Sequence, residues 1–326
     1  MAESSLSLGF PDLLSEVGFY LGYGRTVANF TASQLSEVTA IVQSGVRRVY
    51  YPPAVNANIV GYEWSWLRPN EFIDIFAAYA TGTIGIVSGV VTLTNGVWPS
   101  WASTGALMSG GQSYGNVASR DSNTQITLAD LTVNVSAGAT YSLGKFAYDL
   151  PDNFGRLVGG FHYEPVTYRR PISIISAGRI EDYLARINTT GTPHEAAVRY
   201  KSSDGTTGQR QEVLFFPIPS ADWRLQYEYE AYSGALSDTF PYPLGGMQLA
   251  ELYTESCLAI AETRINDEIG QHQQQFQALI VDCISRDRKR GAQMYGHFGN
   301  HDNDYESDHR GWYLPPFPIT YNGQTL

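Results

Sequence analysis

Histidines and acidic residues cluster near the end of the chain, and both residue types bind metal ions. The cluster comprises His297, His301, His309, Asp302, Asp304, Glu306 and Asp308. His297 and His301 would share a helix face and could bind a metal, but flanking glycines disfavour a helix and no HExxH motif is present. The alternating acids resemble a calcium loop, yet Ser307 replaces its glycine and Tyr313 its bidentate acid. We expect a solvated or interface segment, with an ion site as the alternative.

Other residue patterns that support catalysis are incomplete or absent. Gly22-x-Gly24 lacks the third glycine and the preceding strand of a dinucleotide-binding motif. The sequence contains no nucleophile elbow and no P-loop. Asp149 and Asp152 could form an acid pair, but they flank a predicted turn, where acids are common. The sequence therefore predicts no catalytic residues, no cofactor and no metal site, and a protein that is not an enzyme.

The two cysteines, Cys257 and Cys283, fall in helical patterns near the C-terminus. The first five residues contain an acid where a secretion signal needs a basic start, so we expect no signal peptide. Cysteines of unsecreted proteins are usually buried and reduced, which is the prediction here. A disulfide across the two helices is the alternative.

Aromatic residues offer a second kind of site. Trp64, Trp66, Trp98 and Trp101 could line a groove for a sugar. The simpler interpretation is that these rings face a protein core or a subunit contact. The two interpretations differ in whether the rings are exposed.

A basic run ends the last predicted helix. Arg286, Arg288 and Arg290 could contact DNA or an acidic partner, or could simply be solvated cations at a helix C-terminus, where they favour the helix dipole. The net charge of the chain is −11 with only three lysines, so a broad basic face for DNA is not expected. These arginines are therefore candidates for binding a protein partner.

The composition suits a folded chain with large contact surfaces. It has 326 residues, which favours about two domains, with 16% charged and 13% aromatic residues, including 22 tyrosines. Aromatic rings with a polar group are common at interfaces. No run of 18 apolar residues occurs, so we expect no transmembrane helix and no membrane partner.

Apolar residues at three- and four-residue spacing predict helices near both ends of the chain. The first begins at Phe10, and the second runs from a Thr31–Gln34 capping box to Tyr50. Two more, separated by Gly270, carry apolar stripes over Leu249–Ala261 and Phe276–Ile284. Ile41 and Ile260 lie within these stripes, so both are expected to be buried.

Alternating patterns predict strands between these helices, with one short helix over 179–187. The predicted strands are 62–67, 72–76, 196–200, 212–216 and 223–231. A turn at 204–208 should join two of them into a hairpin.

Residues 78–146 are rich in Gly, Ser, Thr and Asn and contain only four charges. Short β-prone runs alternate with turns, and Asn95-Gly96 is a strong hairpin signal. This region is predicted to be an inserted β-sandwich or barrel.

The predicted fold class is α+β, with a bundle of N- and C-terminal helices, intervening strands and this insertion. The predicted domains are an adaptor core of 1–77 and 147–291, an inserted domain of 78–146, and an extended docking arm of 292–326.

The final segment, 292–326, has aromatic residues but no amphipathic period. Trp312, Tyr313, Phe317 and Tyr321 are predicted to anchor it on a partner. Pro315, Pro316 and Pro318 would hold it extended and so reduce the entropy lost on docking.

Three stretches resemble the head-to-tail adaptor (connector) proteins of tailed bacteriophages: the helix 31–50 with its continuation to Pro53, YDLPDNFG at 148–155, and PYPLGG at 241–246, followed by the helix 252–264. The resemblance implies a ring, usually of twelve copies, attached below the capsid portal protein and continuing the DNA channel. It also implies a C-terminal segment that docks on the portal.

This resemblance implies a virion neck protein that is assembled in the host cytoplasm and contacts tail or nozzle proteins. DNA would pass through the ring without sequence-specific binding, and an acidic wall would not hold it. The alternative from the residues is a β-rich virion protein that binds a host glycan or receptor.

Overall fold

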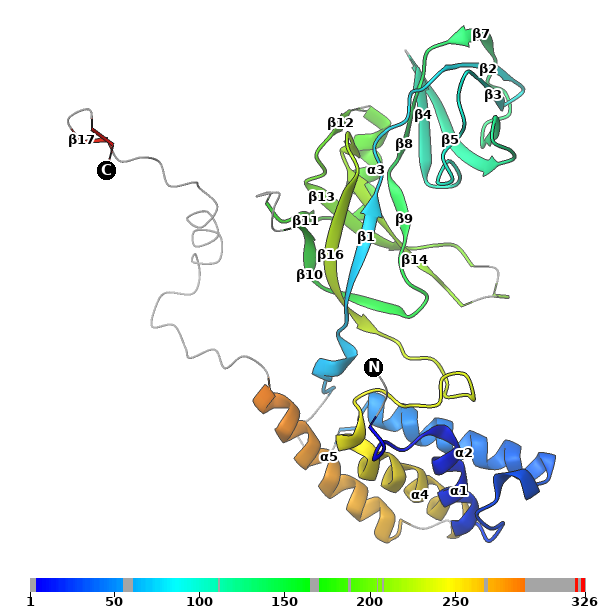
Figure 1. The fold of residues 1–326 in the computed structure, drawn as a ribbon, viewed down its shortest axis with the longest axis vertical. Helices are drawn as coiled ribbons and strands as arrows, with labels where there is room; N and C mark the ends of the chain where they lie inside the picture. Colours follow the sequence, from blue (N-terminus) through cyan, green and yellow to red (C-terminus); the bar gives the residue numbers. More distant parts are fainter. Residues whose placement is uncertain are drawn as a thin grey trace. The chain divides into compact units, whose positions relative to one another are not determined.

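The computed structural model describes residues 4–54, 61–110, 112–164, 170–186, 189–203, 205–206, 208–266, 269–290, 320–321 and 324–325. The protein is a mixed α+β chain, with five α-helices among the described residues (Figure 1). It divides into two compact units. The helical unit comprises the described residues of Met1–Pro69 and Ala231–His297, and the β unit those of Asn70–Glu230 and Phe298–Leu326.

Four helices of the helical unit match the predicted ones. They are α1 (Phe10–Tyr20), α2 (Ala32–Tyr50), α4 (Ala250–Asn266) and α5 (Gln271–Arg290). Short 3-10 turns, η1 (Val27–Asn29), η2 (Ser65–Leu67) and η4 (Met247–Leu249), lie between them. The predicted capping box is confirmed, because the Gln34 amide N–H donates to Thr31 Oγ1 at 3.3 Å and the Thr31 N–H donates to Gln34 Oε1 at 2.8 Å.

Residues of α1, α2, α4 and α5 share one hydrophobic core. Ile41 is fully buried as predicted, whereas Ile260 is only partly buried at its margin. Both cysteines are free thiols and buried, which confirms the simpler prediction. The contact between α2 and α4 is close at Gly45, where an added Cβ would lie 2.5 Å from Cys257 Sγ and 2.9 Å from Cys257 Cα.

The strand predicted over 62–67 is wrong, because this segment contains the 3-10 turn η2. Its large side chains alternate because Trp64 is buried against α2, where its indole N–H donates to the Val49 carbonyl oxygen at 2.8 Å. The polar Ser65 between the two tryptophans faces a buried acid on α5. The period-two pattern therefore reflects packing on helices.

The strands predicted at 72–76, 196–200, 212–216 and 223–231 are confirmed, as is the helix, α3 (Ala177–Arg186). A three-stranded sheet consists of β1 (Asn70–Ile75), β16 (Trp223–Ala231) and β10 (Phe154–Tyr163), in that order. A four-stranded sheet consists of β11 (Ser173–Ile174), β13 (Glu195–Tyr200), β14 (Gln211–Phe216) and β9 (Ala147–Asp149), in that order. The pair β12 (Thr190–Gly191) and β15 (Ile218–Pro219) is parallel. The predicted antiparallel hairpin partners, β13 and β14, are paired from Glu195↔Phe216 to Tyr200↔Gln211.

Aromatic rings join these sheets. Phe161 on β10 packs edge-on against Phe215 on β14 and at a tilt of 42° against Tyr227 on β16, with ring centroids 5.2 Å apart in each case. The strict alternation predicted for β16 is confirmed, since Leu225, Tyr227 and Tyr229 are buried and the residues between them are half-buried. On another part of the four-stranded sheet, Ile180 of α3 packs with Ala197 and Leu214.

Residues 83–145 form a seven-stranded antiparallel sheet that curls into a half-barrel (Figure 1). Its strand order is β7-β2-β3-β6-β5-β4-β8. The strands are β2 (Thr83–Val87), β3 (Val90–Thr94), β4 (Ala106–Gly110), β5 (Gln112–Arg120), β6 (Gln125–Leu128), β7 (Val135–Ala139) and β8 (Ser142–Lys145). Register shifts in three strand pairs bend it, as β-bulges do.

The prediction of a hairpin at Asn95-Gly96 is wrong, although Asn95 does have a positive φ of 62°. The hairpin lies at Ser88-Gly89, both with positive φ, between the paired strands β2 and β3. After Asn95 the chain leaves the sheet, and β3 pairs on its other side with β6. Gly96 instead lies where a Cβ would come within 3.0 Å of the Leu93 side chain and the Thr81 carbonyl oxygen.

The half-barrel also contacts the rest of the β unit. Trp101 stacks on Phe76 with ring centroids 6.0 Å apart, and a Cβ at Gly144 of β8 would lie 2.4 Å from the Ile218 side chain. Its hydrophobic core is nevertheless distinct from the core beneath α3. The division into an adaptor core, an inserted domain and a docking arm stays a prediction.

The β17–β18 pair near the C-terminus comprises Thr320–Tyr321 and Gln324–Thr325. Within the described part of the chain, none of the helices has the length and apolarity needed to span a membrane.

Candidate partner-binding site

The predicted basic run lies at the C-terminal end of α5, but its arginines differ in their contacts. Arg286 is largely exposed, and its guanidinium pairs with Asp282 one turn earlier at 2.5 Å. Arg288 Cζ lies 5.3 Å from the centre of the Tyr62 ring. Arg290 is the last residue of α5. The two described guanidinium groups are therefore held separately, one by a carboxylate and one over an aromatic ring.

Asp287, between these arginines, is the residue that sequence reasoning missed. Its carboxylate is buried and accepts three hydrogen bonds: from Tyr62 Oη at 2.8 Å, from the Ser65 amide N–H at 2.9 Å and from Ser65 Oγ at 2.5 Å. A buried carboxylate is costly unless hydrogen bonds compensate it, and here they do. The segment 62–67 is thus fixed to the end of α5.

A signal for Asp287 was present in the sequence. It follows Cys283 by four residues and Ile284 by three, so it lies on the apolar face of α5 rather than on the solvated face. Burial and the Asp287 hydrogen bond raise the pKa of the Tyr62 hydroxyl, which therefore stays protonated and remains a donor.

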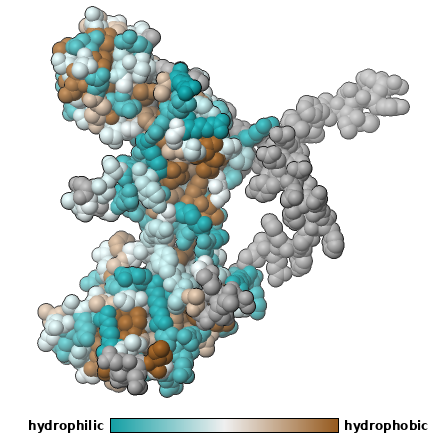
Figure 2. All heavy atoms as spheres, turned by 180° about the vertical axis from the view of Figure 1, so that it is seen from behind, coloured by the Kyte–Doolittle hydropathy of each residue, from teal (hydrophilic) through white to brown (hydrophobic). Residues whose placement is uncertain are grey.

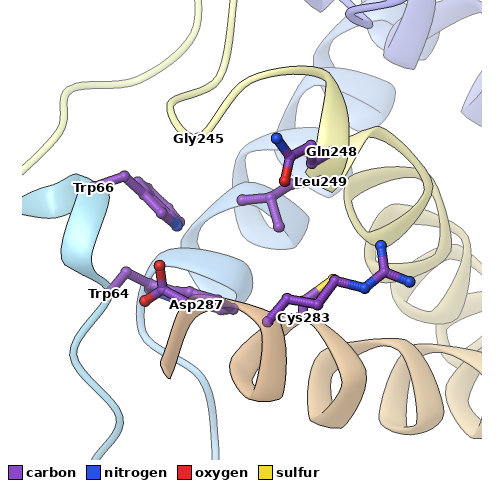
Figure 3. A pocket seen from close by; sticks show the side chains of 8 residues that line it. Trp64, Trp66, Gly245, Gln248, Leu249, Cys283 and Asp287 are labelled. Atoms are coloured by element: carbon purple, nitrogen blue, oxygen red, sulfur yellow. The ribbon is translucent and has the colours of Figure 1, made fainter. Parts of the chain in front are cut away.

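A hollow beside this carboxylate is lined by side chains from three segments (Figure 3). Its residues include Trp64, Trp66, Gly245, Leu249, Cys283 and Asp287. Its volume is about 20 Å³, close to the space of a single water molecule. Gly245 has a φ of +92°, and a Cβ there would lie 2.3 Å from Leu249 Cδ1, so the glycine of the PYPLGG stretch permits close packing. The hollow is a packing feature, too small for an organic ligand.

The remaining predicted anchors are only partly placed. Tyr321 lies in β17, opposite Gln324. Trp312, Tyr313 and Phe317 lie outside the described residues, as do His297, His301 and His309 with their neighbouring acids. Of the predicted partner-binding residues, the structure describes the side chains of Arg286 and Arg288, which lie two residues apart on α5 and have separate partners. Across the described ranges, no group of three His, Cys, Asp or Glu side chains could hold a metal ion.

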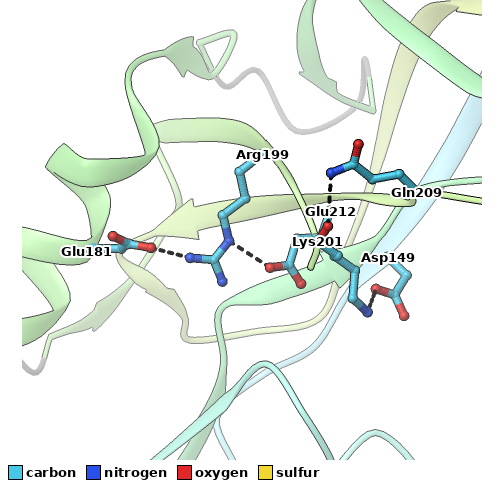
Figure 4. Close-up of polar contacts among 6 residues, drawn as sticks. All are labelled: Asp149, Glu181, Arg199, Lys201, Gln209 and Glu212. Carbon is cyan, nitrogen blue, oxygen red and sulfur yellow. Dashed lines mark hydrogen bonds and ion pairs between the residues drawn. The ribbon is translucent and has the colours of Figure 1, made fainter. Parts of the chain in front are cut away.

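The possible acid pair is not supported, because each acid has its own cation. Asp149 pairs with Lys201, whose Nζ lies 2.7 Å from Oδ1, and Asp152 pairs with Arg210. Figure 4 shows the first pair beside a second group, in which Arg199 bridges Glu181 of α3 and Glu212 of β14. These side chains form a charged row beside β13, β14 and β9 in which three cations pair with four acids, Arg199 being shared by two of them.

The four tryptophans do not form one group. Trp64 and Trp66 belong to the helical unit, while Trp98 and Trp101 belong to the β unit. Trp98 is 1% exposed and packs between Tyr79 and Tyr141 in the half-barrel core. A sugar groove built from all four rings is therefore wrong, and the core interpretation is confirmed for Trp64 and Trp98.

Apolar residues that sequence reasoning did not select form an exposed patch on the helical unit. Phe240 is 72% exposed and Leu6 70%, and the patch is completed by Tyr242, Leu244 and Met247. The two segments run together, since the Phe10 amide N–H donates to the Pro241 carbonyl oxygen at 2.6 Å and Ser4 Oγ lies 3.4 Å from Met247 Sδ. We call these five residues the apolar patch. Other hydrophobic residues are exposed as well, and Figure 2 shows them scattered among hydrophilic ones on one face of the protein.

Comparison with known proteins adds no identification: no family model matches the chain, and no curated protein matches it significantly. The functional argument therefore depends on the residues and geometry described above.

Proposed function

We propose that the protein is a structural, non-enzymatic virion protein. Its copies assemble into a ring that joins the capsid portal to the tail and continues the DNA channel. The observation that carries this proposal is the apolar patch, in which five large apolar residues are exposed on two adjoining segments, since large exposed apolar groups mark interaction sites. The patch includes residues of PYPLGG, one of the stretches that resemble the bacteriophage adaptors.

The helices support the same proposal. In it, α1, α2, α4 and α5 act as the bundle predicted from the sequence, with their shared core providing a rigid subunit for the ring. The bonds of Asp287 to Tyr62 and Ser65 fix the point from which the predicted docking arm leaves α5. Arg286, with an exposed guanidinium, would contact acidic groups on the portal or a tail protein.

Charge supports passage of DNA without tight binding. The chain carries a net charge of −11, and a wall with this sign repels phosphates instead of holding them. In this proposal the ring lies in the neck of the virion, after assembly in the host cytoplasm.

Electron microscopy of the purified protein, alone and mixed with portal protein, tests the proposal. We expect rings that bind the portal through the helical unit, and loss of both the rings and portal binding when Phe240→Ser and Met247→Ser are combined. A protein that stays monomeric in both samples and does not bind portal would contradict it. Tyr200→Ser, at an exposed tyrosine of the β unit, is the matched control.

A receptor-binding role is the second candidate, and one feature of the half-barrel favours it. Val87 and Val90 flank the β2–β3 turn and are 71% and 36% exposed, with Leu131, 59% exposed, beside Gly89 of the same turn. This apolar tip fits a protein receptor better than a glycan, because it contains no aromatic ring. Binding to host cells that is lost in Val87→Ser/Leu131→Ser, with rings unaffected, would support this role.

A further inference from the structure

A groove on the helical unit shares no lining residue with the apolar patch and is built by the end of α2 and the segment after β16. Its volume is about 560 Å³, within the range of sites that bind small ligands or short peptide stretches. Val46 and Tyr50 are buried residues that line it, and Arg47, Tyr51 and Tyr232 are exposed residues that line it. The groove thus combines an apolar base with a cation and two exposed phenol rings.

Hydrogen bonds within the protein hold one wall of the groove in place. The Gln43 side chain on α2 donates from Nε2 to the Leu236 carbonyl oxygen at 2.7 Å, and its Oε1 accepts from the Leu236 amide N–H at 3.0 Å. The segment from Tyr232 to Leu236 is thereby attached to α2 at its far end. A preformed groove loses less entropy when a ligand binds.

The exposed groups of the groove are suited to one class of ligand. The rings of Tyr51 and Tyr232 are 45% and 51% exposed, with centroids 6.1 Å apart and planes at 68°. Grooves lined by aromatic rings recognise extended PxxP segments, because the rings pack against proline. Arg47 is exposed, and no carboxylate within the described ranges pairs with it. The ligand should therefore combine prolines with acidic residues.

This chain carries such a sequence beyond α5. Pro315-Pro316-Phe317-Pro318 has the PxxP spacing, with Trp312 just before it and four acids between 302 and 308. We propose that the 312–318 segment of one copy binds the groove of a neighbouring copy, with the acidic stretch directed toward Arg47. This inference rests on the proposed ring, and it specifies how adjacent subunits are joined.

The length of the intervening chain favours a neighbouring copy. Within one copy, the end of α5 is near the groove, because Trp66 lines the hollow beside Asp287 and also contacts Tyr50, with ring centroids 5.7 Å apart. About 20 residues separate α5 from Trp312, and they can reach up to about 70 Å. That reach far exceeds the path within one copy and is enough to cross to the next subunit. Repeated head to tail, such a contact gives a ring when the rotation between copies closes, as the proposed connector requires.

Disulfide trapping in the full chain tests the proposal. Two proteins are mixed under mild oxidation, one carrying Tyr232→Cys and the other Phe317→Cys; the native cysteines are both buried. We expect a disulfide-linked dimer from the mixture and linked oligomers from the double variant. A double variant that closes only within one chain would overturn docking between copies, and no disulfide in either sample would overturn the site.

Two controls separate specific docking from collision. Tyr200→Cys, at an exposed tyrosine on the β unit, replaces Tyr232→Cys and should give no dimer above background. Arg47→Glu, added to the Tyr232→Cys protein, should reduce trapping severalfold by repelling the acidic stretch. Electron microscopy of the unchanged chain and of Trp312→Ser/Phe317→Ser separates failure of the docking site from failure of the connector function. Rings combined with no trapping in the cysteine variants would refute only the docking site. Trapping combined with no rings and no portal binding would refute only the connector.

Discussion

The helical unit and the β unit differ in how their exposed apolar side chains are distributed. On the helical unit, exposed apolar residues such as Phe240 lie on two segments that a backbone hydrogen bond joins. The β unit also exposes apolar residues, such as Phe72, but the face over β13 and β14 carries ion pairs, as where Arg199 bridges Glu181 and Glu212. Exposed apolar groups favour association, whereas exposed ion pairs contribute little stability. The difference teaches that the helical unit is the better candidate for assembly.

The two units also have separate hydrophobic cores, and the largest predicted effect tests that separation. Trp98→Ala removes the largest buried side chain of the half-barrel and should cost about 3–5 kcal/mol of stability. Hydrogen exchange followed peptide by peptide should show faster exchange across β2–β8 and unchanged exchange in α2 and α4. Faster exchange in both units would show that they fold as one.

Gly45→Ala is the reciprocal change in the helical unit. The added methyl group would lie 2.5 Å from Cys257 Sγ, so α2 and α4 must move apart, at a cost of about 1–3 kcal/mol. Exchange should rise in α2 and α4 and not in the half-barrel. Gly178→Ala in α3 is the matched control, because nothing lies within 4 Å of its Cβ position. It should be neutral or slightly stabilising, and equal melting of the two variants would refute the close approach.

The smallest effect is the dependence of the helical unit on pH. Burial raises the pKa of the Cys257 thiol from 9.0 to about 12. The folded state therefore keeps this proton at pH values where the unfolded state loses it. The free energy of unfolding should be independent of this thiol below about pH 9 and fall by up to about 1.4 kcal/mol per pH unit above it.

Urea unfolding between pH 8 and pH 11 measures this slope. Cys257→Ala should be less stable at pH 8 but should show a shallower decline above pH 9, since the titrating thiol is gone. Burial also raises the pKa of Tyr253, so part of the decline should persist. Identical slopes in the two proteins would contradict a buried, protonated thiol.

Much of the helical unit could be predicted from sequence, because a stripe such as Val38, Ile41 and Val42 repeats with the helix period and a capping box marks its start. The β unit was predictable as strands but not as a sheet: β3 pairs with both β2 and β6, and no local pattern encodes that order. The Asn95-Gly96 pair predicted a hairpin that does not form, because a positive φ at Asn95 alone does not make two strands pair.

The candidate site was predictable only in part. Arg286 and Arg288 stood out by charge, but the groups that fix them did not. The helical spacing placed Asp287 on the apolar face of α5, but its partners Tyr62 and Ser65 lie more than 200 residues away in sequence and could not be predicted. The apolar patch could not be predicted either, because exposure of Phe240 depends on how its loop packs beside residues 4–10.

The most direct test of the central claim is the molar mass of matched surface variants by light scattering. Phe240→Ser/Met247→Ser changes the apolar patch, and Val87→Ser/Leu131→Ser changes the exposed tip of the half-barrel; all four side chains are at least 44% exposed, so folding should be preserved. The account predicts that the patch variant loses the assembled species while the tip variant keeps it. Full assembly by the patch variant, or its loss only in the tip variant, would contradict assembly through the helical unit.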